Sequence, residues 1–163
     1  MLVRRAQDDD LAALADLGLA SWQRGIGPHV PPSVREAVRR HNPFVAFLRE
    51  QGGKVLMAEI DGTAAGLAAR EADDAHLSDL WVAPRFEGRG VGSALLLAVE
   101  REVARAGFDA ITLEVLTANT RAASFYRRRG YEVTWQGMRR DSILVIDLHK
   151  TAMRKGLACA RCR

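Results

Sequence analysis

The sequence predicts a single α/β domain of the α+β type, in which helices flank a mixed, mostly antiparallel central sheet of about seven strands. The chain has 163 residues, a length that suits one domain with a full-sized core. Hydrophobic residues make up 48% of it and charged residues 27%, as in ordinary globular proteins. Short apolar runs alternate with segments of helical periodicity, in the order β-α-α-β-β-β-α-β-α-β-β.

The first third of the chain is expected to form one strand and then helices. Residues 2–5 (LVRR) are predicted as a short strand. Three aspartates begin residues 8–22, whose apolar residues recur every three or four positions, which is typical of a helix with an acidic N-terminus. After a loop rich in glycine and proline, Ser33 is a candidate N-cap for a short helix over residues 34–41. A further helix is predicted over residues 42–52, with proline in its first turn and glycine at its end.

Three strands are then expected to form a meander. Apolar runs over residues 54–60 and 63–71 flank an Asp-Gly pair, which is a strong signal for a hairpin between two strands. The third strand is predicted over residues 74–83 and should stop at the proline that follows.

Helices and strands alternate in the second half of the chain. A long helix is predicted over residues 88–106 and a strand over residues 109–116. Because a helix connects this strand to the strand at 74–83, we expect these two strands to be parallel neighbours. Asn119 is predicted to cap the next helix, which should end before Gly130.

Two final strands, over residues 131–138 and 141–148, are predicted to complete the sheet. The domain would then comprise residues 1–149, and residues 150–163 would form a basic C-terminal tail. No repeat or linker divides the chain further.

The composition excludes several functional classes. No segment approaches the roughly 18 consecutive apolar residues of a membrane span, and the N-terminus has no apolar signal region, so we expect a cytoplasmic protein. The only cysteines, Cys159 and Cys162, would supply two ligands where structural zinc takes about four, so no metal site is predicted. The net charge of +4 invites a nucleic-acid partner, but no recognition motif is present and the arginines gather around the segments described next.

Three glycines stand on alternate positions at the start of the predicted long helix: Gly88, Gly90 and Gly92. The first N–H groups of a helix are unpaired and carry part of the positive end of its dipole. Glycine keeps Cβ atoms away from a ligand, and Arg89 adds a permanent positive charge. This pattern predicts a phosphate or diphosphate site.

Two familiar phosphate motifs fit this segment poorly. The nucleoside-triphosphate loop needs a lysine after its glycines, and none follows here. The dinucleotide fingerprint also needs an acidic residue at the end of the next strand, whereas Asp109 precedes that strand and Glu114 lies inside it.

The sequence resembles the GCN5-related N-acetyltransferase (GNAT) superfamily. The resemblance rests on LSDLWVAPRFEGRGVGSALL and ITLEVLTANTRAASFYRRRGYE, and the element order agrees with the family over residues 1 to about 149. The family motif [QR]-x-x-G-x-[GA] reads Glu87 to Gly92 here. Glu87 departs from it, and we expect its carboxylate to turn away from the diphosphate.

The resemblance implies that acetyl-CoA is the co-substrate and that no metal takes part. It implies that the backbone of Leu80, Trp81 and Val82 pairs with the pantetheine arm, and that Asn119 reaches the same arm. The diphosphate would be cradled by six consecutive residues: Gly88, Arg89, Gly90, Val91, Gly92 and Ser93.

The same resemblance implies an acid and suggests candidate bases for acetyl transfer. Tyr126 would approach the sulfur and protonate the departing thiolate, and it lies about two helical turns after Asn119, on the same face. A backbone N–H near Trp81 would stabilise the oxyanion. Glu114, in mid-strand, is the first candidate for the base and Asp79 the rival, and the reaction can also proceed without a dedicated base.

The expected activity is transfer of an acetyl group from acetyl-CoA to a primary amine by direct attack, through a tetrahedral intermediate. The amine could belong to a peptide N-terminus, a lysine or a small molecule. Trp22 and residues 135–141 are candidate acceptor contacts. The alternative is a non-catalytic acyl-CoA-binding sensor. A homodimer is compatible with the sequence, whereas neither a nucleic acid nor a membrane is an expected partner.

Overall fold

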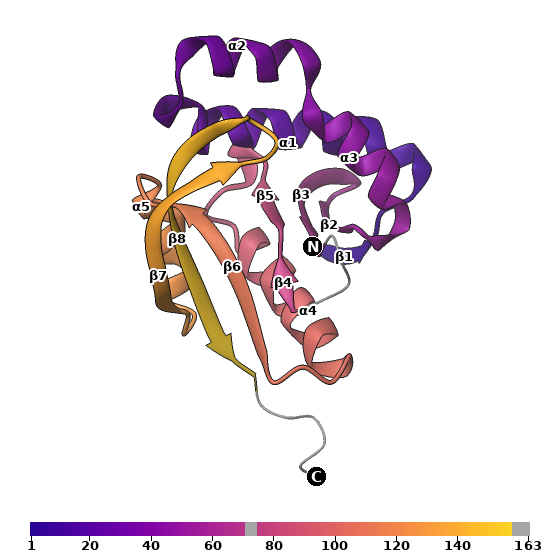
Figure 1. The fold of residues 1–163 in the computed structure, drawn as a ribbon. Coiled ribbons are helices and arrows are strands. Elements are labelled where there is room, and N and C mark those ends of the chain that lie inside the picture. Colours follow the sequence, from indigo (N-terminus) through magenta and orange to yellow (C-terminus); the bar gives the residue numbers. More distant parts are fainter. Residues whose placement is uncertain (71–74, 158–163) are drawn as a thin grey trace.

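The computed structural model describes residues 1–70 and 75–157, which form two four-stranded sheets covered by helices (Figure 1). The strand order is β1-β2-β3-β5 in the first sheet and β4-β6-β8-β7 in the second. The predicted fold class is confirmed, although the single sheet expected from the sequence is divided into two. Glu71, Asp74, Cys159 and Cys162, which entered the predictions above, lie outside the described residues.

The first sheet is antiparallel throughout. Its strands are β1 (Leu2–Arg5), β2 (Leu56–Ile60), β3 (Thr63–Ala69) and β5 (Asp79–Val82). The predicted hairpin joins β2 to β3, and Asp61 and Gly62 in its turn have φ values of 50° and 72°. Both values lie in the left-handed region, which a two-residue hairpin turn of this hand requires.

The N-terminal helices are α1 (Leu11–Gly25), α2 (Pro32–His41) and α3 (Pro43–Gln51). Residues 8–10 form a 3-10 turn that leads into α1. The prediction that Ser33 caps α2 is wrong, because the helix starts at Pro32, two residues earlier than predicted, and Ser33 lies inside it. Proline suits the first helical position, since its fixed φ is helical and its missing N–H would be unpaired there anyway.

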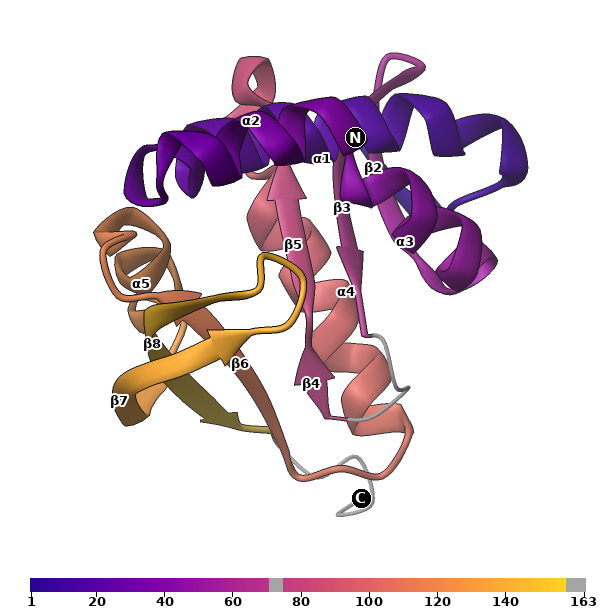
Figure 2. The ribbon, with the colours of Figure 1, turned by 45° about the horizontal axis from the view of Figure 1, so that its top comes forward.

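The predicted strand over residues 74–83 is split at Ser78 into β4 (His76–Leu77) and β5. Both the N–H and the Oγ of Ser78 donate to the carbonyl oxygen of Ala69, at 3.0 and 3.1 Å. Strand β4 pairs in parallel with β6 (Ala110–Leu116), as expected, whereas β5 pairs with β3. Beyond Ser78 the strands β5 and β6 diverge, as Figure 2 shows.

Helix α4 (Val91–Arg105) begins three residues later than predicted. Gly88 and Gly90 have φ values of 74° and 82°, so the chain before the helix is left-handed and Gly90 serves as its N-cap. The buried face of α4 packs on β2 and β3. It reaches Gly66 of β3, whose absent Cβ leaves room for Val91 and Leu95.

Helix α5 (Thr120–Arg127) begins as predicted, because the Oδ1 of Asn119 accepts the N–H of Ala122 at 3.1 Å. Strands β7 (Glu132–Asp141) and β8 (Ile146–Gly156) follow. The strand predicted over 141–148 is therefore misplaced, since residues 142–145 form a turn.

Strand β8 lies between β6 and β7, and the predicted domain boundary after residue 149 falls inside it. Residues 150–154, which were predicted to belong to a basic tail, are paired on both sides, and Lys155 and Gly156 pair with β6. Thr151 and Met153 are buried, whereas Lys150 and Arg154 occupy alternate positions on the opposite face of the strand. The basic residues concealed this alternation in the sequence.

We expect Gly66→Ala to destabilise the protein by about 1–3 kcal/mol, because the new methyl group would overpack the contact between β3 and α4. A Cβ at this position would lie 2.8 Å from Val91 Cγ1 and 2.9 Å from the backbone oxygen of Trp81. Gly156→Ala is the matched control, since nothing lies within 4 Å of a Cβ there. Urea unfolding would measure both, and equal stability of the two variants would contradict the packing argument.

Candidate active site

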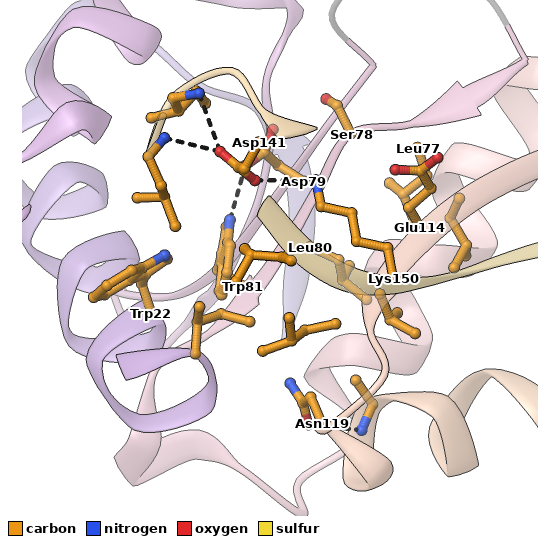
Figure 3. A pocket seen from close by; sticks show the side chains of 18 of the residues that line it. Trp22, Leu77, Ser78, Asp79, Leu80, Trp81, Glu114, Asn119, Asp141 and Lys150 are labelled. Carbon is orange, nitrogen blue, oxygen red and sulfur yellow. Dashed lines mark hydrogen bonds and ion pairs between the residues drawn. The ribbon is translucent and has the colours of Figure 1, made fainter. Parts of the chain in front are cut away.

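A cavity of about 510 Å³ lies between the two sheets, where β5 and β6 diverge. Strands β5 and β6 and helix α5 contribute to its lining, as do helices α1 and α3 and the turn between β7 and β8. Figure 3 shows Trp22, Asp79, Glu114 and Asn119 among the side chains that surround it. Segments from both halves of the chain therefore converge on one space.

Strand β5 has one edge without a strand partner, because it is the last strand of the first sheet. The N–H of Ala83 donates to the carbonyl oxygen of Ala65 in β3, so the carbonyl of Val82 points the opposite way. Backbone groups alternate along a strand, and those of Leu80 therefore also point away from β3. Ser21 Oγ already donates to the oxygen of Val82, at 2.7 Å. The N–H groups of Leu80 and Val82 remain directed toward the free edge.

The structure gathers some of the predicted residues in the cavity and leaves others outside it. Leu80, Trp81, Asn119 and Tyr126 line the cavity, together with both candidate bases. Val82 and residues 88–93 are not part of its lining; they form the end of β5, the glycine turn and the start of α4. The residues predicted for the site therefore lie partly in the cavity and partly at the end of β5 and the start of α4.

Tyr126 is held among aromatic rings. Its ring meets those of Phe125 and Tyr131 edge to face, at centroid distances of 5.1 and 5.4 Å. The hydroxyl of Tyr131 donates to buried Glu100 at 3.0 Å, and Lys155 binds the same carboxylate at 2.8 Å. This network fixes one of the rings that contact Tyr126.

Asp79 lies at the start of β5 and lines the cavity. Burial raises the pKa of Asp79, and hydrogen bonds from Trp81 and Ser78 oppose only part of this effect. Burial also raises the pKa of Tyr126, and the charge of Asp79 adds to the increase. The carboxyl group of Asp79 therefore has a raised pKa, and its negative charge helps to keep the hydroxyl of Tyr126 protonated.

Glu114, the other candidate base, forms an ion pair with Arg139 of β7. The two side chains are directly hydrogen-bonded, so the charge of Glu114 is compensated within the protein. Glu114 is half-buried between the buried Leu113 and Val115, in line with the predicted alternation along the strand, and it lines the cavity. Arg139 arrives from a strand that sequence spacing does not relate to residue 114, and the pair was not predicted.

The glycine turn is surrounded by arginines. A Cβ added at Gly88 or Gly90 would meet nothing within 4 Å, so the backbone of both residues is open to approach. Gly90 offers no side chain to cap α4, and the first N–H groups of the helix are left for another partner. Glu87, the departure from the family motif, is bound by Arg121 at 2.8 Å and by Arg24 at 3.5 Å.

Two residues of the predicted diphosphate cradle also have packing roles. A Cβ on Gly92 would lie 3.3 Å from the ring of Phe125, so this glycine lets α5 approach α4. The hydroxyl of Ser93 is hydrogen-bonded by the guanidinium of Arg129, which also stacks over Phe125 with 3.7 Å between its Cζ and the ring centroid. Their side-chain positions thus join the two helices that border the site.

The turn between β7 and β8 contributes cavity residues that the sequence indicated only through residues 135–141. Oδ1 of Asp141 accepts the N–H groups of Ile143 and Leu144 at 3.0 and 2.9 Å, and its Oδ2 accepts Nζ of Lys150 at 3.0 Å. Burial alone would raise the pKa of Asp141, but these hydrogen bonds outweigh it and hold the pKa below its usual range. An Asp-Ser pair is a turn signal that could have located this feature.

Within residues 1–70 and 75–157, no group of three or more His, Cys, Asp or Glu side chains is placed to hold a metal ion. In the same residues, no helix has both the length and the apolar character needed to cross a bilayer.

Comparison with known proteins adds four findings, three from sequence and one from structure. A sequence model of the acetyltransferase (GNAT) family matches residues 12–131. An S-alkylcysteine N-acetyltransferase of Bacillus subtilis (strain 168) is 38% identical over 73 residues, which are 41% of this chain and only 39% of that protein. An uncharacterized N-acetyltransferase of Methanocaldococcus jannaschii is 37% identical over 137 residues, covering 80% of this chain and 78% of the relative.

A solved structure of similar fold is the PaiA N-acetyltransferase from Thermoplasma acidophilum in complex with coenzyme A. The two chains superpose with a TM-score of 0.76 at 22% sequence identity, over 95% of this chain and 98% of the other. This likeness shows that the two proteins share a fold.

We expect Asp141→Asn to lower the free energy of unfolding by about 1–2 kcal/mol at pH 7, because it removes the charge that binds Lys150. The pKa of Asp141 is depressed in the folded state below its ordinary 3.8, so its stabilisation is present above that value and is lost as the pH falls through the folded pKa. The difference in free energy of unfolding between variant and wild type should therefore disappear below about pH 4.

Asp147→Asn is the matched control on the same hairpin, since that carboxylate is 62% exposed and lies 3.6 Å from Arg140. It should change stability by less than about 0.5 kcal/mol. Denaturant titrations of both variants between pH 3 and pH 8 would measure the difference, and a gap for Asp141→Asn that widens in acid would contradict the assignment.

Proposed function

The chain belongs to the acetyltransferase (GNAT) family, and from this premise we propose that it transfers an acetyl group from acetyl-CoA to a small primary amine. The observation that carries the proposal is the meeting of three features at one cavity: the free edge of β5, the carboxylate of Asp79 and the ring of Tyr126. A binding module without catalysis would need the strand edge but neither side chain.

The donor side of the proposal rests on backbone groups. The N–H groups of Leu80 and Val82 face the open edge, where an extended arm with amide groups can pair as an added strand would. The left-handed turn at Gly88 and Gly90 leaves the N-terminus of α4 accessible to a diphosphate. The remaining residues of the predicted cradle, including Arg89, stand around the same turn, and acetyl-CoA fits this arrangement.

Asp79 is the base that the geometry supports best. It takes part in none of the ion pairs formed by the described residues, whereas Glu114 is bound to Arg139. Its raised pKa brings it nearer to that of an amine that must lose a proton. Asp79 would accept this proton directly or through a water, and the N–H of Val82 would stabilise the oxyanion.

Tyr126 is the acid in the proposed reaction. Burial keeps its hydroxyl protonated, so it can give a proton to the thiolate that leaves when the acetyl group is transferred. Direct attack of the amine on the thioester needs no enzyme-bound acyl group, and none of the residues lining the cavity is a cysteine.

A small-molecule acceptor is favoured among the three classes considered. The Bacillus subtilis relative is named for S-alkylcysteine, which is a small primary amine. The mixed walls of the cavity suit such a compound, since Asp79 faces the same space as aromatic residues of α1 and α3. A homodimer and a cytoplasmic location stay predictions.

We expect Tyr126→Phe to lower kcat by about 10²–10⁴-fold, because the thiolate then leaves without a positioned proton donor. The KM for acetyl-CoA should change little, since the ring remains in place. Thiol release from acetyl-CoA in the presence of a panel of small amines would measure both constants. Binding of acetyl-CoA without turnover on any amine would favour the sensor, and unchanged kcat would remove Tyr126 from the mechanism.

Asp79 should control the acidic limb of the pH profile. A base works only when deprotonated, so kcat/KM should fall as the pH drops through its pKa, and burial places that limb above the ordinary value of 3.8. Asp79→Asn should remove this limb and lower the plateau, whereas Glu114→Gln should keep the limb. The wild type and both variants are assayed with the same amine, so ionisation of the amine affects all three pH profiles equally. Loss of the limb in Glu114→Gln alone would reverse the assignment.

A further inference from the structure

A second cavity, of about 360 Å³, lies beside the first, between helix α2 and the turn that joins β7 to β8. Its apolar lining comes from Val34, Ala37 and Val38 of α2 and from Pro43, Ile143 and Leu144. The last three residues also line the first cavity, so the two spaces share a wall. No role described above uses the second cavity.

The two cavities differ in polarity. The first contains the carboxylate of Asp79 and two ion pairs, Glu114 with Arg139 and Asp141 with Lys150. His76 also lines it, as does Arg140, which pairs with Asp147. Because each of these ion pairs is internally compensated, Asp79 is left to hold the positive charge of an incoming ammonium group. The second cavity is lined by apolar residues apart from two polar side chains of α2, Ser33 and His41. A ligand that spans both would therefore be charged at one end and apolar at the other.

The residues shared by the two cavities have no free backbone N–H group to donate to a bound peptide. Pro43 has no N–H, and the N–H groups of Ile143 and Leu144 both donate to Oδ1 of Asp141. The carbonyl oxygens of a peptide crossing this wall would lose water and gain no donor from it, at a cost of the kind that unpaired buried polar groups carry. A hydrocarbon chain has no such requirement, so the wall suits an apolar tail.

From this juxtaposition we propose that the second cavity is the far part of the acceptor site and holds the apolar tail of a small primary amine whose nitrogen lies at Asp79. The inference rests on the proposed function and adds the class of acceptor to it. Ile143 and Leu144 then separate the reacting end of the acceptor from its tail, and Asp141 positions both residues through their backbone.

The test is a series of unbranched primary amines from butylamine to decylamine, with acetyl-CoA as donor. In the wild type, kcat/KM should rise about threefold to fourfold for each methylene that enters the second cavity. Ala37→Phe, at an exposed position of α2, places a ring in that cavity and should abolish the rise for the longer amines. Ala13→Phe, at an exposed position of α1 outside both cavities, is the matched control and should keep it.

The outcomes separate the inference from the function on which it rests. Acetylation of all the amines with no dependence on chain length, or the same dependence in all three proteins, would overturn the inference and leave the function standing. Preference for peptides with an apolar residue near the N-terminus, lost in Ala37→Phe, would overturn it in favour of a peptide acceptor. A preference for octanoyl-CoA over acetyl-CoA that Ala37→Phe removes would assign the cavity to the acyl donor instead. Failure to acetylate any amine would overturn both.

Discussion

The bend at Ser78 is the constraint on which the rest of the site depends. Two hydrogen bonds from this one residue to the carbonyl of Ala69 end the run of the chain beside β6 and turn it toward β3. The backbone of β5 consequently has an open edge in the interior of the molecule, where a strand would otherwise pair. The cavity, the exposure of Asp79 to it and the approach to the glycine turn all follow from that division.

The groups around this edge are held by interactions that do not involve a ligand. The ring of Tyr126 is fixed between Phe125 and Tyr131, and Tyr131 is tied to Glu100 below it. Rigid placement of reacting groups lowers the cost of organising them during a reaction. The proposed acceptor side is fixed differently, by the single carboxylate of Asp141, so its shape depends on one side chain in a turn.

Local signals in the sequence predicted much of this structure. The Asp-Gly hairpin, the cap at Asn119 and the glycine turn before α4 are decided by neighbours a few residues apart, and each was found where the residues indicated. The division at Ser78, the ion pair of Glu114 with Arg139 and the central place of β8 were not predicted. Each of them depends on strands that meet across the fold, and the basic residues of β8 hid the buried positions of Thr151 and Met153.

An open strand edge is also a hazard, because another chain can add to it and start an aggregate. Strand β5 has only four residues, and its last outward carbonyl is already occupied by the hydroxyl of Ser21. A long strand from another chain could therefore form only a few hydrogen bonds with β5 before Ser21 interrupts the pairing. A short ligand with few amide groups does not need more. The contact between Ser21 and Val82 can thus protect the solubility of a protein that must keep one edge open.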